Sequence, residues 1–388
     1  MAPDIALERV INLPKHSIVL DPMAGSGTVL READKAGLKA IGFDMDPLAV
    51  LIARVATTQC ESDNLVCLAE AIVQKAEQID GRKVRLDWID SDAETSQFVK
   101  FWFAPSQRLQ LRKLAKIFEQ DEDINSRPAE RNALLLAMSR IIVTKEQRAS
   151  LARDTSRSRP HKVAEDNNFD VFPEFVRSAK RLSRILEEEA PTGLADVRTG
   201  DARNMESITD GTIDAVITSP PYLNAIDYLR GHKMSLVWMG HSISGLRRIR
   251  TDSVGAERRP DEHLDTEIVN PILAAVGKID ELPSRYQGMI KRYAIDLSNL
   301  AKELSRVVRD HGSATFVVGN SCLREIPINN AAGLASAAAM HGFKLVDQAE
   351  RQLPARNRSL PFVKNDNNNL GKRMGSEHVM VFEKLAAK

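Results

Sequence analysis

The chain has 388 residues, of which 43% are hydrophobic and 28% are charged, and its 54 basic and 53 acidic residues leave a formal net charge of +1. No apolar run approaches the roughly 20 residues of a membrane-spanning helix, and the first residues lack the basic start and apolar stretch of a secretory signal, so we expect a cytoplasmic protein with a sizeable core. The three cysteines, Cys60, Cys67 and Cys322, have no CxxC spacing, which excludes a disulfide framework and predicts no metal site.

The first segment of the chain predicts a strand, a turn, a helix and a second strand. One β-branched run covers residues 17–21, and a second covers residues 39–43 and ends at Asp44. Between them, residues 28–36 have a helical pattern that stops at Gly37, a common C-terminal stop. A strand–helix–strand unit of this kind predicts a parallel α/β sheet.

Residues 61–190 carry a different pattern, with long charged and apolar stretches of helical period and few strand signals. We therefore expect a mostly helical insertion at 61–190. Residues 1–60 and 191–388 are then expected to form one discontinuous α/β domain around it.

Five more strand-like runs follow the insertion, at residues 195–198, 213–218, 313–319, 344–347 and 378–382. An amphipathic helix precedes the run at 313–319, with apolar residues at spacings of three and four from Tyr293 to Val308, and we expect it to close at Gly312. Seven strands with helices between them predict a Rossmann-like, doubly wound α/β sheet. Its second interruption is the Arg-rich segment 241–284, which we expect to be a loop and a candidate element for target recognition.

The turn after the first strand reads DPMAGSGT, residues 21–28. Gly25 and Gly27 allow a sharp turn and close approach to a ligand, and the next helix points its first N–H groups into the same space. Asp44 ends the second strand 17 residues after Gly27, near the spacing at which a carboxylate meets ribose hydroxyls. The pair predicts a site for an adenosine-containing cofactor, although many tight turns contain such glycines for packing alone.

The dinucleotide-binding pattern is incomplete, because Leu30 stands where the third glycine is needed. This argues against NAD. Asp21, at the mouth of the turn, repels phosphate but suits a cationic amine or sulfonium. The turn therefore favours a ligand without phosphates.

DPMAGSGT followed by AIGFDMDPLAV resembles the first two motifs of S-adenosylmethionine-dependent amino-methyltransferases of DNA. TGDARNM (199–205) resembles their third motif and ITSPPY (217–222) resembles their catalytic fourth motif. The resemblance implies S-adenosyl-L-methionine as the cofactor and duplex DNA with a flipped-out base as the substrate. The cofactor-binding residues that it implies are Asp21, Pro22, Gly25, Ser26, Gly27, Thr28, Asp44, Met45, Asp201 and Ala202. Asp201 would receive the adenine amino group of the cofactor, and Met45 would either cover the adenine ring or belong to the core.

The SPPY motif has a chemical rationale in this family. An aromatic amine is a poor nucleophile until its nitrogen becomes more tetrahedral, and two acceptors aimed at its hydrogens favour that geometry. By resemblance these acceptors are the Ser219 side chain and the Pro220 carbonyl, held still because Pro220 and Pro221 restrict the backbone. Tyr222 would stack on the extruded base, and the methyl group would move by direct displacement. A proline-terminated strand with a packed tyrosine is the plain structural alternative.

The identity of the base is less defined. Within the family, Ser before the two prolines favours cytosine N4, and adenine N6 stays the alternative because a serine hydroxyl can donate or accept. Methylation at carbon 5 needs a cysteine nucleophile, typically after proline, and the three cysteines here follow Gln59, Val66 and Ser321. We therefore exclude carbon-5 chemistry.

Two arginine-rich segments are candidates for contacts with DNA phosphates. Their arginines are Arg153, Arg157 and Arg159 in residues 140–162, and Arg247, Arg248 and Arg250 in residues 247–259. Solvated charged loops are the alternative for each, and residues 354–361 are a weaker candidate. Asp227 and Tyr228 either line the base pocket or pack beside it. The glycine turn precedes SPPY here, whereas SPPY comes first in the common arrangement with these motifs, so the target-recognition element is left open.

We therefore expect a DNA amino-methyltransferase. Cognate restriction or defence proteins are possible partners that the family association alone implies, and the sequence leaves the oligomeric state undefined. An RNA methyltransferase is one rival, because the same pocket chemistry serves RNA bases. A non-catalytic nucleic-acid-binding subunit with the same fold is another, against which the intact SPPY motif argues. A dinucleotide oxidoreductase is a distant third.

Overall fold

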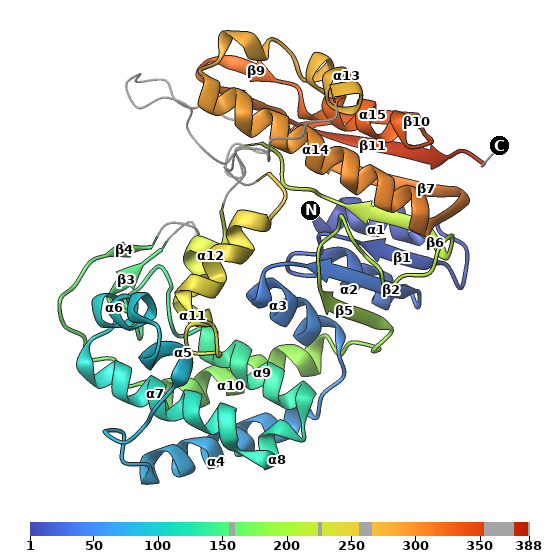
Figure 1. Cartoon of the computed structure of the whole chain (residues 1–388). Coiled ribbons are helices and arrows are strands. Elements are labelled where there is room, and N and C mark those ends of the chain that lie inside the picture. Colours follow the sequence, from blue (N-terminus) through green and yellow to red (C-terminus); the bar gives the residue numbers. More distant parts are fainter. Residues whose placement is uncertain (155–159, 224–226, 256–265, 353–375, 387–388) are drawn as a thin grey trace. The chain divides into compact units, whose positions relative to one another are not determined.

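The computed structural model describes residues 1–154, 160–223, 227–255, 266–352 and 376–386 (Figure 1). The chain forms two compact units, each made from more than one stretch of sequence. The sheet unit consists of Met1–Met45, Leu194–Ala225 and Thr251–Lys388, and the helical unit consists of Asp46–Gly193 and Ile226–Arg250.

The sheet unit is built on seven strands. In chain order these are β1 (Ile18–Asp21), β2 (Lys39–Asp44), β5 (Ala195–Thr199), β6 (Ile213–Thr218), β7 (Val308–Val318), β10 (Phe343–Gln352) and β11 (Ser376–Lys384). Their order in the sheet is β10-β11-β7-β6-β1-β2-β5, with β11 antiparallel to both its neighbours and parallel pairing elsewhere. The seven runs expected from the sequence all form strands, and the Rossmann-like, doubly wound fold is confirmed.

Helices and one hairpin complete the sheet unit. They are α1 (Pro3–Ile11), α2 (Thr28–Lys35), α13 (Thr266–Val276), η2 (Ile279–Glu281), α14 (Ser284–Val307), the hairpin of β8 (Ser321–Leu323) and β9 (Ile326–Ile328), and α15 (Asn330–Met340). Helix α2 packs on β1, β2 and β5, whereas α14 packs on β7 and α15 on β10 (Figure 1). The buried core between them includes Leu20, Val216, Leu297, Leu300 and Phe316.

Helix α14 ends earlier than expected. It stops at Val307, and β7 starts at Val308, so Gly312 lies inside a strand and the predicted stop at Gly312 is wrong. The register between β6 and β7 shifts after Val308, and the next pair along joins Ala215 to Ser313. A Cβ atom at Gly312 would lie 2.6 Å from Val308 Cγ1. Glycine is therefore needed there because the bulged strand approaches itself closely.

The helical unit contains most of the remaining elements. They are α3 (Pro47–Thr57), η1 (Ser62–Asn64), α4 (Leu65–Gln78), α5 (Asp87–Asp90), α6 (Ala93–Trp102), α7 (Pro105–Gln120), α8 (Glu122–Asn125), α9 (Pro128–Ser139), β3 (Ala152–Arg153), β4 (His161–Lys162), α10 (Val171–Glu188) and α11 (Leu229–Leu236). Helix α12 (Ile243–Asp252) follows and reaches the boundary of the unit at Arg250. The unit is larger than the segment 61–190, because α3, α11 and most of α12 are part of it.

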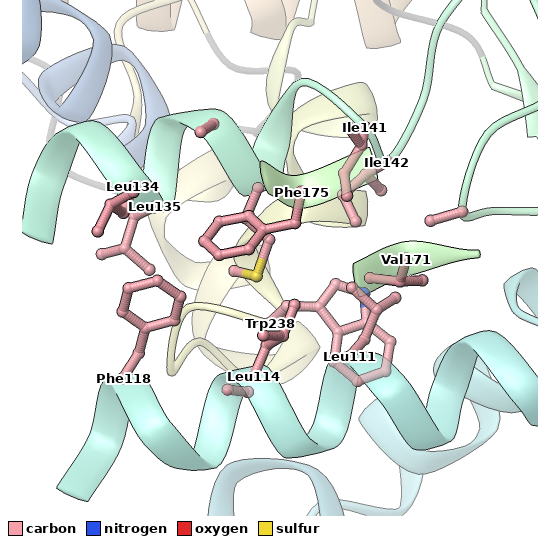
Figure 2. Packing of buried hydrophobic residues seen from close by; sticks show 14 of the residues in the cluster. Leu111, Leu114, Phe118, Leu134, Leu135, Ile141, Ile142, Val171, Phe175 and Trp238 are labelled. Atoms are coloured by element: carbon pink, nitrogen blue, oxygen red, sulfur yellow. The ribbon is translucent and has the colours of Figure 1, made fainter. Parts of the chain in front are cut away.

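The core of the helical unit is a continuous apolar cluster. Figure 2 shows Phe175 of α10 facing Phe118 of α7, and their rings meet edge to face with centroids 6.2 Å apart. Trp238 packs edge to face on Phe103 with a centroid separation of 5.0 Å. Burial of such large side chains is the main force that stabilises a unit of this kind.

The Arg-rich segment 241–284 is mostly helical where it is described, which corrects the expected loop. In α12, Ile243 and Leu246 are buried and Ile249 is partly buried against the same core. Apolar residues three positions apart fall on one face of a helix, so this face packs while the arginines point elsewhere. Among the described residues, no helix has the length and apolar character needed to span a membrane.

Candidate active site

The four motifs lie at one edge of the sheet. The strands β6, β1, β2 and β5 are consecutive neighbours and all run parallel. Residue Asp21 is in register with Gly42, and Asp44 is in register with Thr199. The segments that follow these strands therefore start side by side at the carboxyl edge, where open α/β sheets bind their ligands.

The glycine turn is sharp and open on one side. Gly25 has φ 52° and Gly27 has φ 80°, both in the left-handed region that favours glycine. A Cβ atom at Gly25 would meet nothing within 4 Å, so the turn leaves space beside its backbone. The Gly25 N–H donates to Asp44 Oδ2 over 2.8 Å. Asp44 thus fixes the shape of the turn, in addition to the ribose contact that the sequence predicts.

The missing third glycine has a structural counterpart. Leu30, which replaces it, is fully buried in α2. A Cβ atom at Gly42 of β2 would lie 2.4 Å from Leu30 Cδ1. The strand therefore supplies the glycine that lets helix and sheet approach closely, a role that the third glycine has in dinucleotide folds.

Asp21 connects the glycine turn to the SPPY strand. Its side chain is buried, with the residue 3% exposed, and its Oδ1 accepts from Thr218 Oγ1 at 2.7 Å and from the Met23 N–H at 3.2 Å. Burial raises the pKa of the Asp21 carboxyl to about 6, against the opposite effect of these two hydrogen bonds. Because Thr218 directly precedes Ser219, the first and fourth motifs are joined by a buried hydrogen bond.

Residues 219–223 form a segment that we name the ledge. Ser219 Oγ donates to the Val317 carbonyl of β7 over 3.0 Å, which commits the hydroxyl proton and leaves the oxygen lone pairs to accept. Pro220 is buried, whereas Pro221 and Tyr222 are half-buried. At the far end, the Leu223 carbonyl accepts from Ser321 Oγ over 2.7 Å.

The loop after β5 places Asp201 against an arginine that the sequence analysis missed. Arg203 Nη2 donates to Asp201 Oδ2 over 2.6 Å, and Arg203 Nη1 donates to Asp296 Oδ1 over 2.5 Å. Although burial acts in the opposite direction, the two aspartates raise the pKa of Arg203 further above its usual range. The Asp201 carboxylate is therefore oriented by Arg203, and its contact with the cofactor adenine stays a prediction.

The other predicted cofactor residues differ in exposure. Ser26 is exposed and Thr28 is the half-buried first residue of α2, whereas Pro22 is buried. Ala202 is buried in the core of the sheet unit, so only its backbone is left to meet a ligand. Met45 is half-buried and is part of neither main core cluster of the described residues, which is compatible with a role beside the adenine.

Four of the predicted DNA-binding arginines are described, and they belong to the helical unit: Arg153, Arg247, Arg248 and Arg250. Arg247 pairs with Glu94, and Arg250 pairs with Asp227 at 2.5 Å. Arg248 is exposed and makes no ion pair with another described residue, and Arg153 is exposed on β3. Arg157, Arg159 and the segment 354–361 lie outside the described residues. Tyr228 is exposed, and Asp227 also lies 3.8 Å from Arg230 of α11, so Asp227 is paired with arginines of its own unit.

No family model matches the chain. It is 22% identical over 345 residues to the type II methyltransferase M.MvaI of Kocuria varians, which covers 81% of this chain and 72% of that protein. The type II methyltransferase M.AvaI of Nostoc sp. is also 22% identical, over 361 residues, with coverage of 82% and 71%. A stretch of 46 residues, 12% of this chain and 9% of the other, is 44% identical to M.BsoBI of Geobacillus stearothermophilus.

Solved structures with some likeness include methyltransferases. A geranyl diphosphate methyltransferase in complex with SAM aligns with a TM-score of 0.36 and 7% identity over 99% of this chain and 84% of that one. A SAM-dependent methyltransferase from Methanosarcina mazei aligns with a TM-score of 0.35 and 9% identity over 100% and 99%. The sequence relatives, which extend over four fifths of the chain, confirm the resemblance carried by the motifs. The chain is thus similar in sequence to proteins named type II methyltransferases.

Proposed function

We propose that this protein transfers a methyl group from S-adenosyl-L-methionine to the exocyclic amino group of a base in DNA, with cytosine N4 as the favoured target. The observation that carries the proposal is the hydrogen bond from Thr218 to Asp21, which holds the start of the ledge beside the glycine turn. The relatives named type II methyltransferases support the same activity.

The residues at the glycine turn suit this cofactor. The open space beside Gly25 leaves room for a ligand against the backbone, and Asp44 stands next to it through the Gly25 N–H. A buried carboxyl such as Asp21 gains from a nearby positive charge, because the charge stabilises its ionised form. Bound S-adenosylmethionine would supply a sulfonium-activated methyl group. Asp21, Gly25, Gly27 and Asp44 are the residues that we expect to hold it.

The ledge provides the acceptors that the chemistry needs. Because the Ser219 hydroxyl donates its hydrogen bond to the Val317 carbonyl, its oxygen can act towards a substrate only as an acceptor. Two acceptors, Ser219 Oγ and the Pro220 carbonyl, bind the two hydrogens of an amino group and raise the nucleophilicity of its nitrogen. Fixed acceptors need no reorganisation during the reaction, which is the main advantage of a rigid site.

The choice of cytosine rests on the neutral serine before the two prolines. An acceptor at this position suits the amino group of either cytosine or adenine, so adenine N6 is the second candidate. The structural feature that favours both over a ring-carbon target is the acceptor role of Ser219.

The test is transfer of tritium from labelled cofactor to unmethylated duplex DNA, with transfer RNA as the competing substrate. We expect label in DNA only. Ser219→Ala should lower the rate by at least about 100-fold, because a fixed hydrogen-bond acceptor at the reacting group is lost. Ser178→Ala is the matched control, since Ser178 Oγ also donates to a buried carbonyl, that of Ala137, but lies in the helical unit. Cofactor binding without label in any nucleic acid would favour a non-catalytic subunit instead.

A further inference from the structure

The backbone of the ledge has few N–H groups with which to hydrogen-bond to the rest of the sheet unit. Pro220 and Pro221 have no backbone N–H, so neither can donate a hydrogen bond to the sheet. The segment must be held through its carbonyl oxygens and side chains, or through residues that donate to it. The two ends of the ledge meet this need in different ways, and the far end depends on residues outside all four motifs.

A buried relay of hydrogen bonds ends on the Leu223 carbonyl. Asn330, which is 0% exposed, donates through Nδ2 to the Gly319 carbonyl at 2.9 Å and to Ser321 Oγ at 2.5 Å. Ser321 Oγ in turn donates to the Leu223 carbonyl at 2.7 Å. The carbonyl of Gly319 can only accept, so the amide nitrogen of Asn330 must face it and Ser321. The serine therefore accepts from Asn330, and its own proton is directed at Leu223.

The same short stretch of chain holds both ends of the ledge. Val317, at the end of β7, accepts from Ser219, and Ser321, at the start of β8, donates to Leu223. Ser219 and Leu223 are four residues apart, and so are their partners Val317 and Ser321. The stretch 317–321 therefore runs beside the ledge along its length. Val317 is itself fixed in the sheet by its pairing with Val379 of β11.

From this arrangement we propose that Ser321 and Asn330 are positioning residues for methyl transfer, an inference that rests on the proposed function. They determine the path of the ledge and so the place of the Pro220 carbonyl, one of the two acceptors for the target amino group. Displacement of a reacting group by about 1 Å can lower a rate by about 100-fold. Loss of the Ser321 hydroxyl frees one end only, so we expect a fall in kcat of about 10-fold or more.

The experiment compares Ser321→Ala with the unaltered protein and with Ser178→Ala. Tritium transfer to duplex DNA gives kcat, and calorimetric titration with the cofactor gives both its Kd and the number of intact sites. We expect Ser321→Ala to have an unchanged cofactor Kd and a lower kcat per site. Ser321→Thr, which keeps a hydroxyl, should recover most of the loss, and Ser178→Ala should keep the full kcat per site.

The outcomes distinguish a failure of the positioning role of Ser321 from a failure of the proposed methyl transfer. A purely structural role for Ser321 would lower the number of cofactor sites and leave kcat per site unchanged, which would overturn the positioning role. If Ser321→Ala does not fold, Ser321→Cys, which fills the space but donates weakly, takes its place and must show the same fall. No transfer by the unaltered protein would refute the proposed function itself, whereas full turnover in Ser321→Ala would refute only the present inference.

Discussion

The substitution Asp21→Asn is expected to stabilise the protein at neutral pH while it weakens cofactor binding. Asn is close to Asp in shape, and both hydrogen bonds of Asp21, from Thr218 and from Met23, end on the same oxygen. The amide oxygen of Asn can accept both. The substitution therefore removes a buried charge, keeps these two contacts and adds an amide NH₂ whose effect does not depend on pH. The pH dependence of the stability difference then measures what the charge does.

The magnitude follows from the pKa of Asp21. Burial raises this pKa to about 6 in the folded protein, and the unfolded chain has an ordinary aspartate pKa of about 3.9. Between these two values the folded protein binds more protons than the unfolded chain, so the free energy of unfolding falls as pH rises. The full effect, reached above pH 6, is about 3 kcal/mol, because each pKa unit corresponds to about 1.4 kcal/mol. At pH 5 roughly half of it is present.

The assay is urea unfolding of both proteins at pH 5 and pH 8, followed by far-UV circular dichroism. Tryptophan fluorescence alone is insufficient, because Trp88, Trp102 and Trp238 all lie in the helical unit. We expect the stability advantage of Asp21→Asn to grow by about 1 to 2 kcal/mol from pH 5 to pH 8. Any constant offset from the substitution cancels in this comparison. An advantage that is equal at the two pH values, or smaller at pH 8, would refute the reasoning.

Asp90→Asn in α5 is the control with the opposite sign. Burial acts to raise the pKa of Asp90, but hydrogen bonds from Arg112 and from the Leu86 N–H outweigh it and lower the pKa. A lowered pKa means that the carboxylate stabilises the fold above the unfolded-chain pKa, and that this contribution is lost only as pH falls through the folded value. Asp90→Asn should therefore be less stable than the unaltered protein by the same amount at pH 5 and pH 8.

Four further predictions concern the site and its surroundings. Tyr222→Ala should lower kcat/KM for DNA by about 10- to 100-fold and Tyr222→Phe by much less, because stacking needs only the ring; equal effects would contradict stacking. Asp44→Ala should weaken cofactor binding by at least about 10-fold in calorimetry, since the Gly25 N–H loses its acceptor, and an unchanged Kd would argue against the turn as the cofactor site. Arg248→Ala should reduce the slope of log K for DNA binding against log salt concentration by about one unit in anisotropy titrations. Arg247→Ala should reduce this slope by less, because the guanidinium of Arg247 already pairs with Glu94, and the reverse ranking would exclude Arg248 as a phosphate contact. Gly42→Ala should destabilise the fold by about 1 to 3 kcal/mol in urea unfolding, because its Cβ would overlap Leu30, and full stability would show that the helix can shift freely.

Much of the sheet could be predicted because each strand has its own local signal. The β-branched runs before Asp21, Asp44 and Ser219 mark the strands that carry the motifs, and parallel order then places their ends together. Gly37, with φ 72°, ends α2 as its position after the helical pattern indicates. Signals of this kind depend on neighbours in sequence, so they can be read before the fold is known.

What could not be predicted depends on pairs that are distant in sequence. The hydrogen bonds from Thr218 to Asp21 and from Ser321 to Leu223 join residues 197 and 98 positions apart, and no spacing in the sequence predicts them. Arg203 had a weak signal, since it lies two residues after Asp201, but its second partner, Asp296, lies on α14. The helical state of α12 was not predicted, because its many arginines indicate a solvated loop and the apolar spacing of Ile243 and Leu246 is a weaker signal.

The proposed function depends most on one claim, that the ledge activates the amino group of a base opposite the cofactor. Mass spectrometry of nucleosides, after incubation of unmethylated duplex DNA with the protein and deuterium-methyl-labelled cofactor, tests it directly. We expect labelled N4-methylcytosine, and none when Ser219→Ala replaces the unaltered protein. Labelled N6-methyladenine would support the same chemistry at the ledge but with adenine as the target base. Labelled 5-methylcytosine, or a protein that binds the cofactor and leaves every base unlabelled, would contradict the claim.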